Sequence, residues 1–157
     1  MRELSDELIA FLHGGASMLA ASRDAELRSW MSRAVGVRVG ADRRTLTCYI
    51  PDRAGAQLLA VAVQGAPLAV TVCRVSTLRT VQLKGTITAV RPAADRERPH
   101  IADQTGGYFE ELAAIGFAPA VVERLTVWPA TALELRIESL FEQTPGPGAG
   151  RQMEPSS

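Results

Sequence analysis

The segment at residues 79–90 has the sequence RTVQLKGTITAV, and polar and apolar residues alternate over ten of its positions, 80–89. An alternation with period two is typical of a β-strand that has one apolar and one polar face. A strand of this length lies at the centre of a sheet or wraps around a barrel, so it constrains the whole fold. Its polar side chains meet either water or a ligand, and they are a cation, an amide and hydroxyls: Lys84, Gln82, Thr80, Thr86 and Thr88.

Shorter segments on both sides of this strand also show strand patterns bounded by turn residues. Residues 35–39 and 45–50 form a predicted hairpin around a tight turn at residues 41–44. Further strands are predicted at residues 17–22, 68–73 and 131–141. Because hairpins replace a regular β-α-β alternation, the sequence predicts a mainly β fold with short helices (α+β), built as an antiparallel barrel or sandwich of about six strands.

Four short helices are predicted to fill the ends of this barrel. The first starts at Ser5 and ends at Gly14. The second runs from Pro51 to Val63 and is nearly all apolar, so we expect it to be mostly buried. The third covers residues 104–116 and the fourth covers residues 119–125. The residues of the third helix that we expect to face inward are Phe109, Leu112, Ala113 and Ile115.

The composition is that of one domain with a hydrophobic core, because 46% of the 157 residues are hydrophobic. We expect this domain to cover residues 1–144, and the Pro/Gly/Ser-rich tail, residues 145–157, to be mobile. A net charge of zero gives no reason to expect a nucleic-acid partner, and the apolar runs are too short to span a membrane. With no signal-peptide pattern and no CxxC spacing, Cys48 and Cys73 are expected to be reduced core residues of a cytoplasmic protein.

The sequence contains no standard catalytic motif: no P-loop, no GxGxxG after a strand and no GxSxG. His13 and His100 have no ligand spacing, so no metal site is predicted. Arginines, an amide and hydroxyls instead lie near predicted strand ends, and Arg53 begins a predicted helix. Guanidinium groups suit a phosphate, whereas amides and hydroxyls suit a ribityl chain or a ring edge. Two interpretations stay open here, an anionic cofactor or solvated surface groups.

The order of these elements resembles that of the pyridoxamine 5′-phosphate oxidase-like, FMN-binding split-barrel proteins. The resemblance covers residues 4–142 in element order, and its most specific motif is RTVQLKG at residues 79–85. It rests also on the hairpin at residues 35–50, the Pro-Asp-Arg helix start at residues 51–53 and LAVTV at residues 68–72. The resemblance implies a six-stranded antiparallel split barrel, a homodimer, and one FMN in each of two clefts at the subunit interface.

The same resemblance implies roles for individual residues. Arg79 and Thr80 fall where the family has an Arg-Gln pair, whose second member contacts FMN. Arg53 falls near the family's basic pair, after the third strand, that holds the FMN phosphate. The predicted second strand corresponds to one that lines the flavin ring, and Arg38 is its only long polar group. Trp128 falls where the family often places an aromatic residue near the flavin of the partner subunit.

Two polar residues of the central strand have less definite roles. Gln82 is expected to reach a polar edge of the flavin. Lys84, the only lysine, is open to three interpretations: a cofactor contact, a salt bridge to the partner subunit, or a solvated charge.

The departures from the family pattern limit the predicted function. The last strand, ALELRIESLF at residues 132–141, lacks the Arg-Leu-His-type motif that grips pyridoxal phosphate. The Arg/Ser cluster for the substrate phosphate is also missing, so vitamin B6 oxidation is not expected. The sequence predicts an FMN-dependent oxidoreductase of unknown substrate, in which the cofactor supplies the chemistry and no protein acid or base is required. The alternative is a split-barrel dimer without FMN that binds haem or a deazaflavin, or acts as an interaction module.

Overall fold

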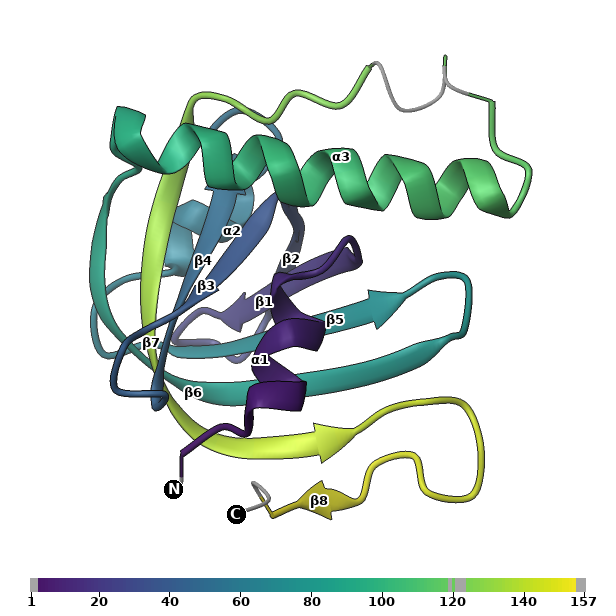
Figure 1. Ribbon diagram of the computed structural model, residues 1–157. Coiled ribbons are helices and arrows are strands. Elements are labelled where there is room, and N and C mark those ends of the chain that lie inside the picture. Colours follow the sequence, from purple (N-terminus) through teal and green to yellow (C-terminus); the bar gives the residue numbers. More distant parts are fainter. Residues whose placement is uncertain (1–2, 119, 121–123, 155–157) are drawn as a thin grey trace.

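The computed structural model describes residues 3–118, 120 and 124–154, and its strands form one antiparallel sheet. The strands follow the order β2-β1-β5-β6-β7-β4-β3, and β8 pairs with β7 (Figure 1). Their bounds are β1 (Ser17–Arg23), β2 (Ser29–Ala34), β3 (Gly36–Val39), β4 (Thr45–Pro51), β5 (Pro67–Arg74), β6 (Arg79–Pro92), β7 (Ala130–Glu142) and β8 (Gln152–Met153).

The first and last strands of this order are two parts of one bent strand. Only Val35 separates β2, which pairs with β1, from β3, which pairs with β4. The backbone N–H of Val35 donates a hydrogen bond to the carbonyl of Tyr49 on β4, at 2.9 Å. Residues 29–39 therefore join the two edges of the sheet. Counted as one strand, they give the predicted six-stranded antiparallel split barrel, with β8 as an addition.

The β2 segment was not predicted, because its burial runs against its hydrophobic pattern. Its buried residues are the small Ser32 and Ala34, whereas Met31 is 66% exposed. Period-two reasoning depends on large apolar residues that point inward, and β2 has none. The hairpin of β3 and β4 is confirmed, as are the strands predicted at residues 17–22, 68–73 and 131–141.

The long strand predicted at residues 79–90 is confirmed as β6, which lies between β5 and β7 near the middle of the sheet. Val81, Leu83 and Ile87 point into the barrel core and are at most 1% exposed. A glycine is required at position 85, because a Cβ there would lie 1.9 Å from the carbonyl oxygen of Arg136 on β7. The register of β6 on β7 shifts at this point, which lets the long strand bend around the barrel.

Two helices pack on the barrel with different degrees of burial. Helix α1 (Asp6–His13) is capped by Ser5, as predicted, and buries Leu8, Phe11 and Leu12. Helix α2 (Ala56–Val61) is shorter than predicted and buries only Leu58 among its residues. The prediction that this segment is mostly buried was wrong, because α2 lies on the outside of the barrel and touches it along one side. Val63, which follows α2, is 57% exposed.

Helix α3 (Arg98–Ala114) follows the short 3₁₀ helix η1 (Asp95–Glu97) and lies across the barrel (Figure 1). It begins earlier than predicted, and its buried residues are Ile101, Gln104 and Leu112. The expectation that Ala113 and Ile115 face inward was wrong, since both are exposed. The helix predicted at residues 119–125 falls largely outside the described residues. None of the described helices has the length and apolar character needed to cross a membrane.

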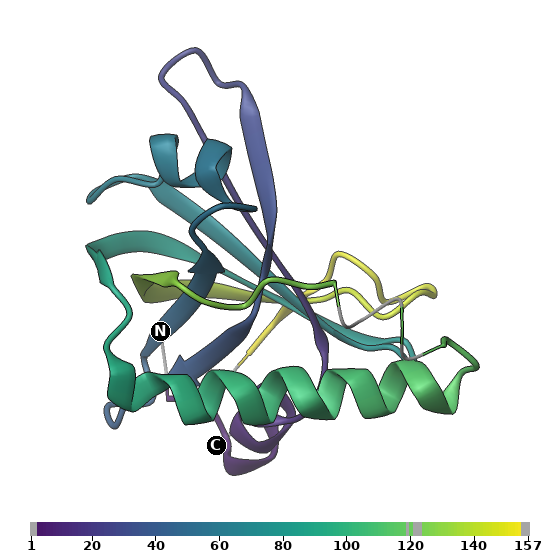
Figure 2. The same cartoon turned by 90° about the horizontal axis from the view of Figure 1, so that it is seen from above.

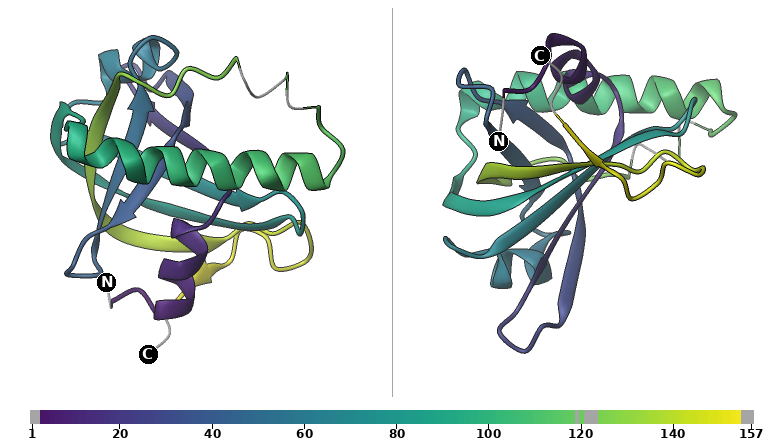
Figure 3. Two further views of the ribbon diagram at one scale, coloured as in Figure 1. Left: turned by 45° about the horizontal axis from the view of Figure 1, so that its top comes forward. Right: turned by 90° about the horizontal axis from the view of Figure 1, so that it is seen from below.

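The helices are distributed unevenly around the sheet. Seen from above, α3 lies along one side, whereas α2 and the tip of the β1–β2 hairpin lie on the other (Figure 2). Helix α1 lies beside α3 (Figure 3). The amide of Gln104 on α3 donates a hydrogen bond to the carbonyl of Leu12 on α1, at 3.1 Å. In the C-terminal segment, Gln152 and Met153 pair with the end of β7. Mobility of residues 145–157 stays a prediction.

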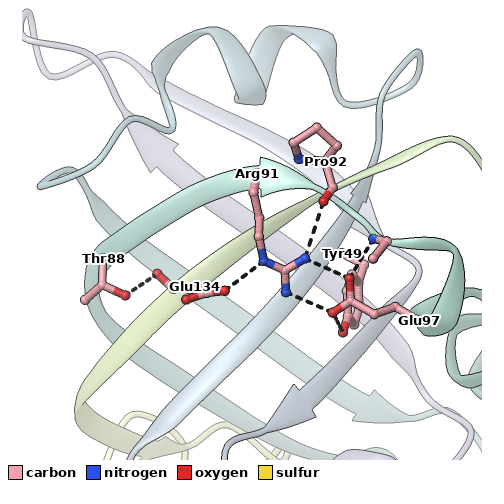
Figure 4. A network of polar contacts seen from close by, with 7 residues as sticks. Tyr49, Thr88, Arg91, Pro92, Glu97 and Glu134 are labelled. Carbon is pink, nitrogen blue, oxygen red and sulfur yellow. Dashed lines mark hydrogen bonds and ion pairs between the residues drawn. The ribbon is translucent and has the colours of Figure 1, made fainter.

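An ionic network around the buried carboxylate of Glu97 fixes the start of α3 to the barrel (Figure 4). Both carboxylate oxygens of Glu97 accept hydrogen bonds from Arg91 on β6, at 2.7 and 2.9 Å. The hydroxyl of Tyr49 on β4 also donates to Glu97, at 2.9 Å, and the N–H of Ala94 donates at 2.8 Å. Arg91 bonds a second carboxylate, that of Glu134 on β7, at 2.9 Å. The network thus ties three strands to the residue that precedes α3.

Candidate functional site

A cavity of about 410 Å³ lies between the bent strand, the β4–α2 turn and α3. Most of its lining is apolar and includes the exposed Leu125. The size falls in the range of small-molecule sites, which is about 300–1,000 Å³. The lining residues are Ala16, Met18, Arg33, Ala34, Val35, Pro51, Arg53, Ala54, Gln104, Thr105, Tyr108, Arg124, Leu125, Thr126 and Val127.

Three arginines give this cavity a positive charge. Arg33 comes from β2, Arg53 from the β4–α2 turn, and Arg124 from the segment that follows α3. Among the described residues, the lining contains no aspartate or glutamate. Within residues 3–118, 120 and 124–154, no carboxylate forms an ion pair with any of these arginines. An apolar cavity with unneutralised guanidinium groups is suited to a ligand that combines an apolar body with an anionic group.

One of these arginines contacts the opposite wall of the cavity. The guanidinium of Arg33 donates a hydrogen bond to the hydroxyl of Tyr108 on α3. Its central carbon also lies 4.9 Å from the centroid of the Tyr108 ring, which is a cation–π distance. Both side chains are half-buried. The pair therefore bridges β2 and α3 across the cavity.

Helix α3 is held as a cavity wall by a buried amide. Gln104 is 3% exposed, and its Oε1 accepts a hydrogen bond from the N–H of Val37 on β3, at 2.7 Å. Its Nε2 donates to Leu12 at the other side, so both ends of the amide are satisfied. Gly107 approaches the backbone of Gly15 so closely that a Cβ on Gly15 would lie 2.2 Å from the Gly107 carbonyl carbon. These contacts set the distance between α3 and the barrel.

The two histidines meet beside this wall, although they are far apart in the sequence. Their ring centroids are 5.6 Å apart. Nε2 of His13 accepts a hydrogen bond from the N–H of Val39 at 3.0 Å, and Nε2 of His100 lies 2.9 Å from the carbonyl oxygen of Val37. Burial lowers the pKa of His13 below its usual 6.5, and the nearby charges of His100 and Arg38 lower it further. Both rings thus bind the backbone of β3.

Of the predicted cofactor contacts, Arg53 lines the cavity and the other residues lie elsewhere on the described chain. Arg38 lies on β3, opposite Thr47 of β4. Trp128 packs against the small buried cluster around Tyr49, and the guanidinium carbon of Arg98 lies 5.5 Å from its ring. Trp128 follows Val127 of the cavity wall directly, so it lies near the site without lining it.

The predicted contacts on β6 have partners of their own. Arg79 pairs with Glu7 of α1 at 2.9 Å, and the hydroxyl of Thr80 donates to the carbonyl of Leu78 at 2.8 Å. Gln82 donates to Thr71 of β5 at 2.9 Å. Nζ of Lys84 lies 4.5 Å from the centroid of the Phe141 ring. The structure therefore does not bring these residues together with Arg53 in one chain, and their cofactor roles stay predictions.

Sequence reasoning missed Arg33, Tyr108 and Arg124 as site residues. Arg33 lies in the strand that was not predicted, and Tyr108 lies in the predicted third helix, where the sequence predicts roles only for apolar residues. The resemblance to the family did identify the turn that carries Arg53. No local sequence pattern indicates the contact between Arg33 and Tyr108, because these residues are 75 positions apart in the chain.

No family model matches the sequence, and no curated protein matches it. Solved structures do share the fold. HupZ from Group A Streptococcus has a TM-score of 0.55 at 12% identity, covering 94% of this chain and 99% of HupZ. A proposed pyridoxamine 5′-phosphate oxidase from Lactobacillus delbrueckii has a TM-score of 0.51 at 16% identity, covering 88% of this chain and 93% of that one. HutZ, the heme storage protein from Vibrio cholerae, has a TM-score of 0.45 at 16% identity, covering 90% of this chain and 95% of HutZ.

The likenesses to HupZ and to the Lactobacillus protein, both with TM-scores above 0.5, establish the fold of the chain. It is the split barrel of the pyridoxamine 5′-phosphate oxidase-like proteins, as the order of the elements in the sequence had indicated.

Proposed function

We propose that this protein binds FMN in the cavity between β2, the β4–α2 turn and α3, and that it is a flavin-dependent oxidoreductase of unknown substrate. The observation that carries the proposal is the lining itself, which is mostly apolar and whose described residues include Arg33, Arg53 and Arg124 but no carboxylate. Such a donor set fits a dianionic phosphate joined to a planar apolar ring. The split-barrel fold supports the same choice of cofactor only as a resemblance.

In this proposal the arginines and the apolar wall have separate tasks. Arg53 and Arg33 bind the phosphate through charge-assisted hydrogen bonds. Met18, Ala34 and Val127 pack against the flavin ring and exclude water from it. FMN, when bound, supplies the redox chemistry, and the protein orients the cofactor and tunes its electrostatic surroundings. No side chain is assigned as a catalytic acid or base.

A homodimer is part of this proposal, with the cofactor at the subunit interface. Several large apolar side chains are exposed on the single chain, among them Met31, Ile115 and Phe117. We propose that the remaining predicted cofactor contacts form in this dimer: Trp128, Arg79, Thr80, Gln82 and Lys84. Light scattering at low micromolar protein is expected to report twice the chain mass, and a monomer would contradict the dimer.

Cys48 and Cys73 are both free thiols, which is compatible with the predicted cytoplasmic location.

Quenching of FMN fluorescence tests the proposed site. Arg53→Ala and Arg33→Ala are each expected to weaken FMN binding about 10- to 100-fold, because each removes a hydrogen bond to a charged group. Arg136→Ala is the matched control, since Arg136 is on β7, is 62% exposed at its side chain and does not line the cavity. Its FMN affinity is expected to equal that of the wild type. Equal losses in all three variants would argue against this cavity as the site.

The alternative function is a split barrel without FMN. The observation that favours it is that Arg53 alone, among the predicted contacts, lines the cavity. A protein that takes up no FMN at high micromolar concentration and that binds haem or a deazaflavin would establish this alternative. A protein that binds none of these ligands would favour an interaction module.

A further inference from the structure

Arg33 contacts Tyr108, and no described carboxylate balances its positive charge in the cavity. A phenol hydroxyl is a neutral acceptor, so it satisfies the hydrogen bond of the guanidinium but not its charge. Two arginines elsewhere in the barrel pair with carboxylates instead. Arg91 bonds two carboxylates, those of Glu97 and Glu134, and Arg79 bonds that of Glu7. Across the described ranges, Arg33 has no such carboxylate.

The Tyr108 hydroxyl therefore occupies the position where an anionic oxygen would interact best with Arg33. We propose that Tyr108 is a place-holder: the anionic group of the incoming ligand displaces the Tyr108 hydroxyl from Arg33, and Tyr108 thereby limits affinity and selects for ligands that carry a phosphate or carboxylate. This inference rests on the proposed function for its preferred ligand, FMN. The step is an exchange of hydrogen-bond acceptors on one guanidinium and involves no covalent change.

The surrounding contacts allow this exchange by a side-chain movement alone. Helix α3 is fixed on one side of Tyr108 by Gln104, which bonds both Val37 and Leu12. On the other side it is fixed by Glu111, which accepts a hydrogen bond from the N–H of Ser76 at 3.2 Å. Rotation of the Tyr108 side chain frees Arg33 without moving the helix. The ring remains in the cavity lining, where it can pack on the ligand.

Tyr108→Phe and Arg33→Ala are expected to change the affinity for FMN in opposite directions. Tyr108→Phe keeps the ring and its cation–π contact but removes the competing hydroxyl, so FMN binding is expected to tighten about three- to tenfold. Arg33→Ala is expected to weaken it at least about tenfold. In the double variant, the effect of Tyr108→Phe is expected to disappear, because the hydroxyl acts only through Arg33. Affinity is measured by fluorescence quenching for FMN and by calorimetry for pyrophosphate, and circular dichroism melts check that each variant is folded.

The outcomes separate this inference from the proposed function. Weaker or unchanged FMN binding in folded Tyr108→Phe overturns the place-holder role, since Tyr108 would then orient Arg33 or bind the ligand itself. If the wild type binds pyrophosphate but not FMN, and the variants change pyrophosphate affinity with the expected signs, the place-holder role stands and the FMN proposal falls. If neither ligand binds, both proposals fall.

Discussion

The buried carboxylate of Glu97 gives the sharpest prediction about stability. Glu97 is 4% exposed, and it accepts hydrogen bonds from Arg91, Tyr49 and Ala94 at 2.7–2.9 Å. The bonds from Arg91 lower the pKa of Glu97 from 4.5 to about 2, with smaller contributions from Ala94 and Tyr49. A lowering of this size corresponds to about 3 kcal/mol of folding free energy above pH 5. Glu97→Gln keeps the shape of the side chain but removes the charge.

We expect Glu97→Gln to lower the free energy of unfolding by about 2–3 kcal/mol at pH 7. Because the folded-state pKa is depressed, the stabilisation is present above the unfolded value of 4.5 and is lost as the pH falls through about 2. At pH 3 the difference between wild type and variant is therefore expected to shrink to less than half. Urea unfolding at both pH values measures it, and fluorescence of Trp128, which packs against the cluster around Tyr49, reports the transition.

Glu138→Gln is the matched control for this experiment. The Glu138 side chain is 51% exposed and lies 3.5 Å from Arg136 on the outside of β7. Its effect is expected to stay within about 0.5 kcal/mol, as for other exposed ion pairs. A loss below about 0.5 kcal/mol for Glu97→Gln at pH 7 would refute the reasoning, and so would a loss that does not shrink at pH 3.

Two further predictions concern packing and thiol reactivity. Gly15→Ala is expected to lower the free energy of unfolding by about 1–3 kcal/mol, because its Cβ would meet the Gly107 backbone. Gly106→Ala is expected to raise the free energy of unfolding by up to about 1 kcal/mol, because no atom lies within 4 Å of its Cβ. Thermal melts compare the two, and equal shifts would contradict the close packing of α3 on the barrel. Burial raises the pKa of Cys48 to about 12. One fast-reacting thiol, that of the half-buried Cys73, is therefore expected per native chain, and both thiols after unfolding; a second fast thiol in the native state would contradict this burial.

The strands that could be predicted are those whose large apolar residues alternate locally. β6 is the best case, since Val81, Leu83 and Ile87 mark its inner face without reference to any other segment. β2 is the opposite case, because Ser32 is buried and Met31 is exposed. The bend at Val35 that closes the barrel depends on a hydrogen bond to Tyr49, and a local pattern cannot show that bond.

The candidate site was harder to predict than the fold for the same reason. Arg53 was found because its turn follows a recognisable strand in the family order. Arg33 and Tyr108 lie on elements that meet only in three dimensions, so their sequence surroundings carry no sign of the contact. Arg79 is a converse case, because its strand position matches the family, whereas its guanidinium pairs with Glu7.

The central claim is that the cavity lined by Arg33, Arg53 and Arg124 binds a flavin through its phosphate. The ratio of FMN to riboflavin affinity for the wild-type protein tests this claim most directly, because the two ligands differ only in the phosphate. We predict that FMN binds at least about 100-fold more tightly, and that the ratio falls about tenfold or more in Arg53→Ala. Equal binding of the two flavins, or no flavin binding at high micromolar concentration, would contradict the account.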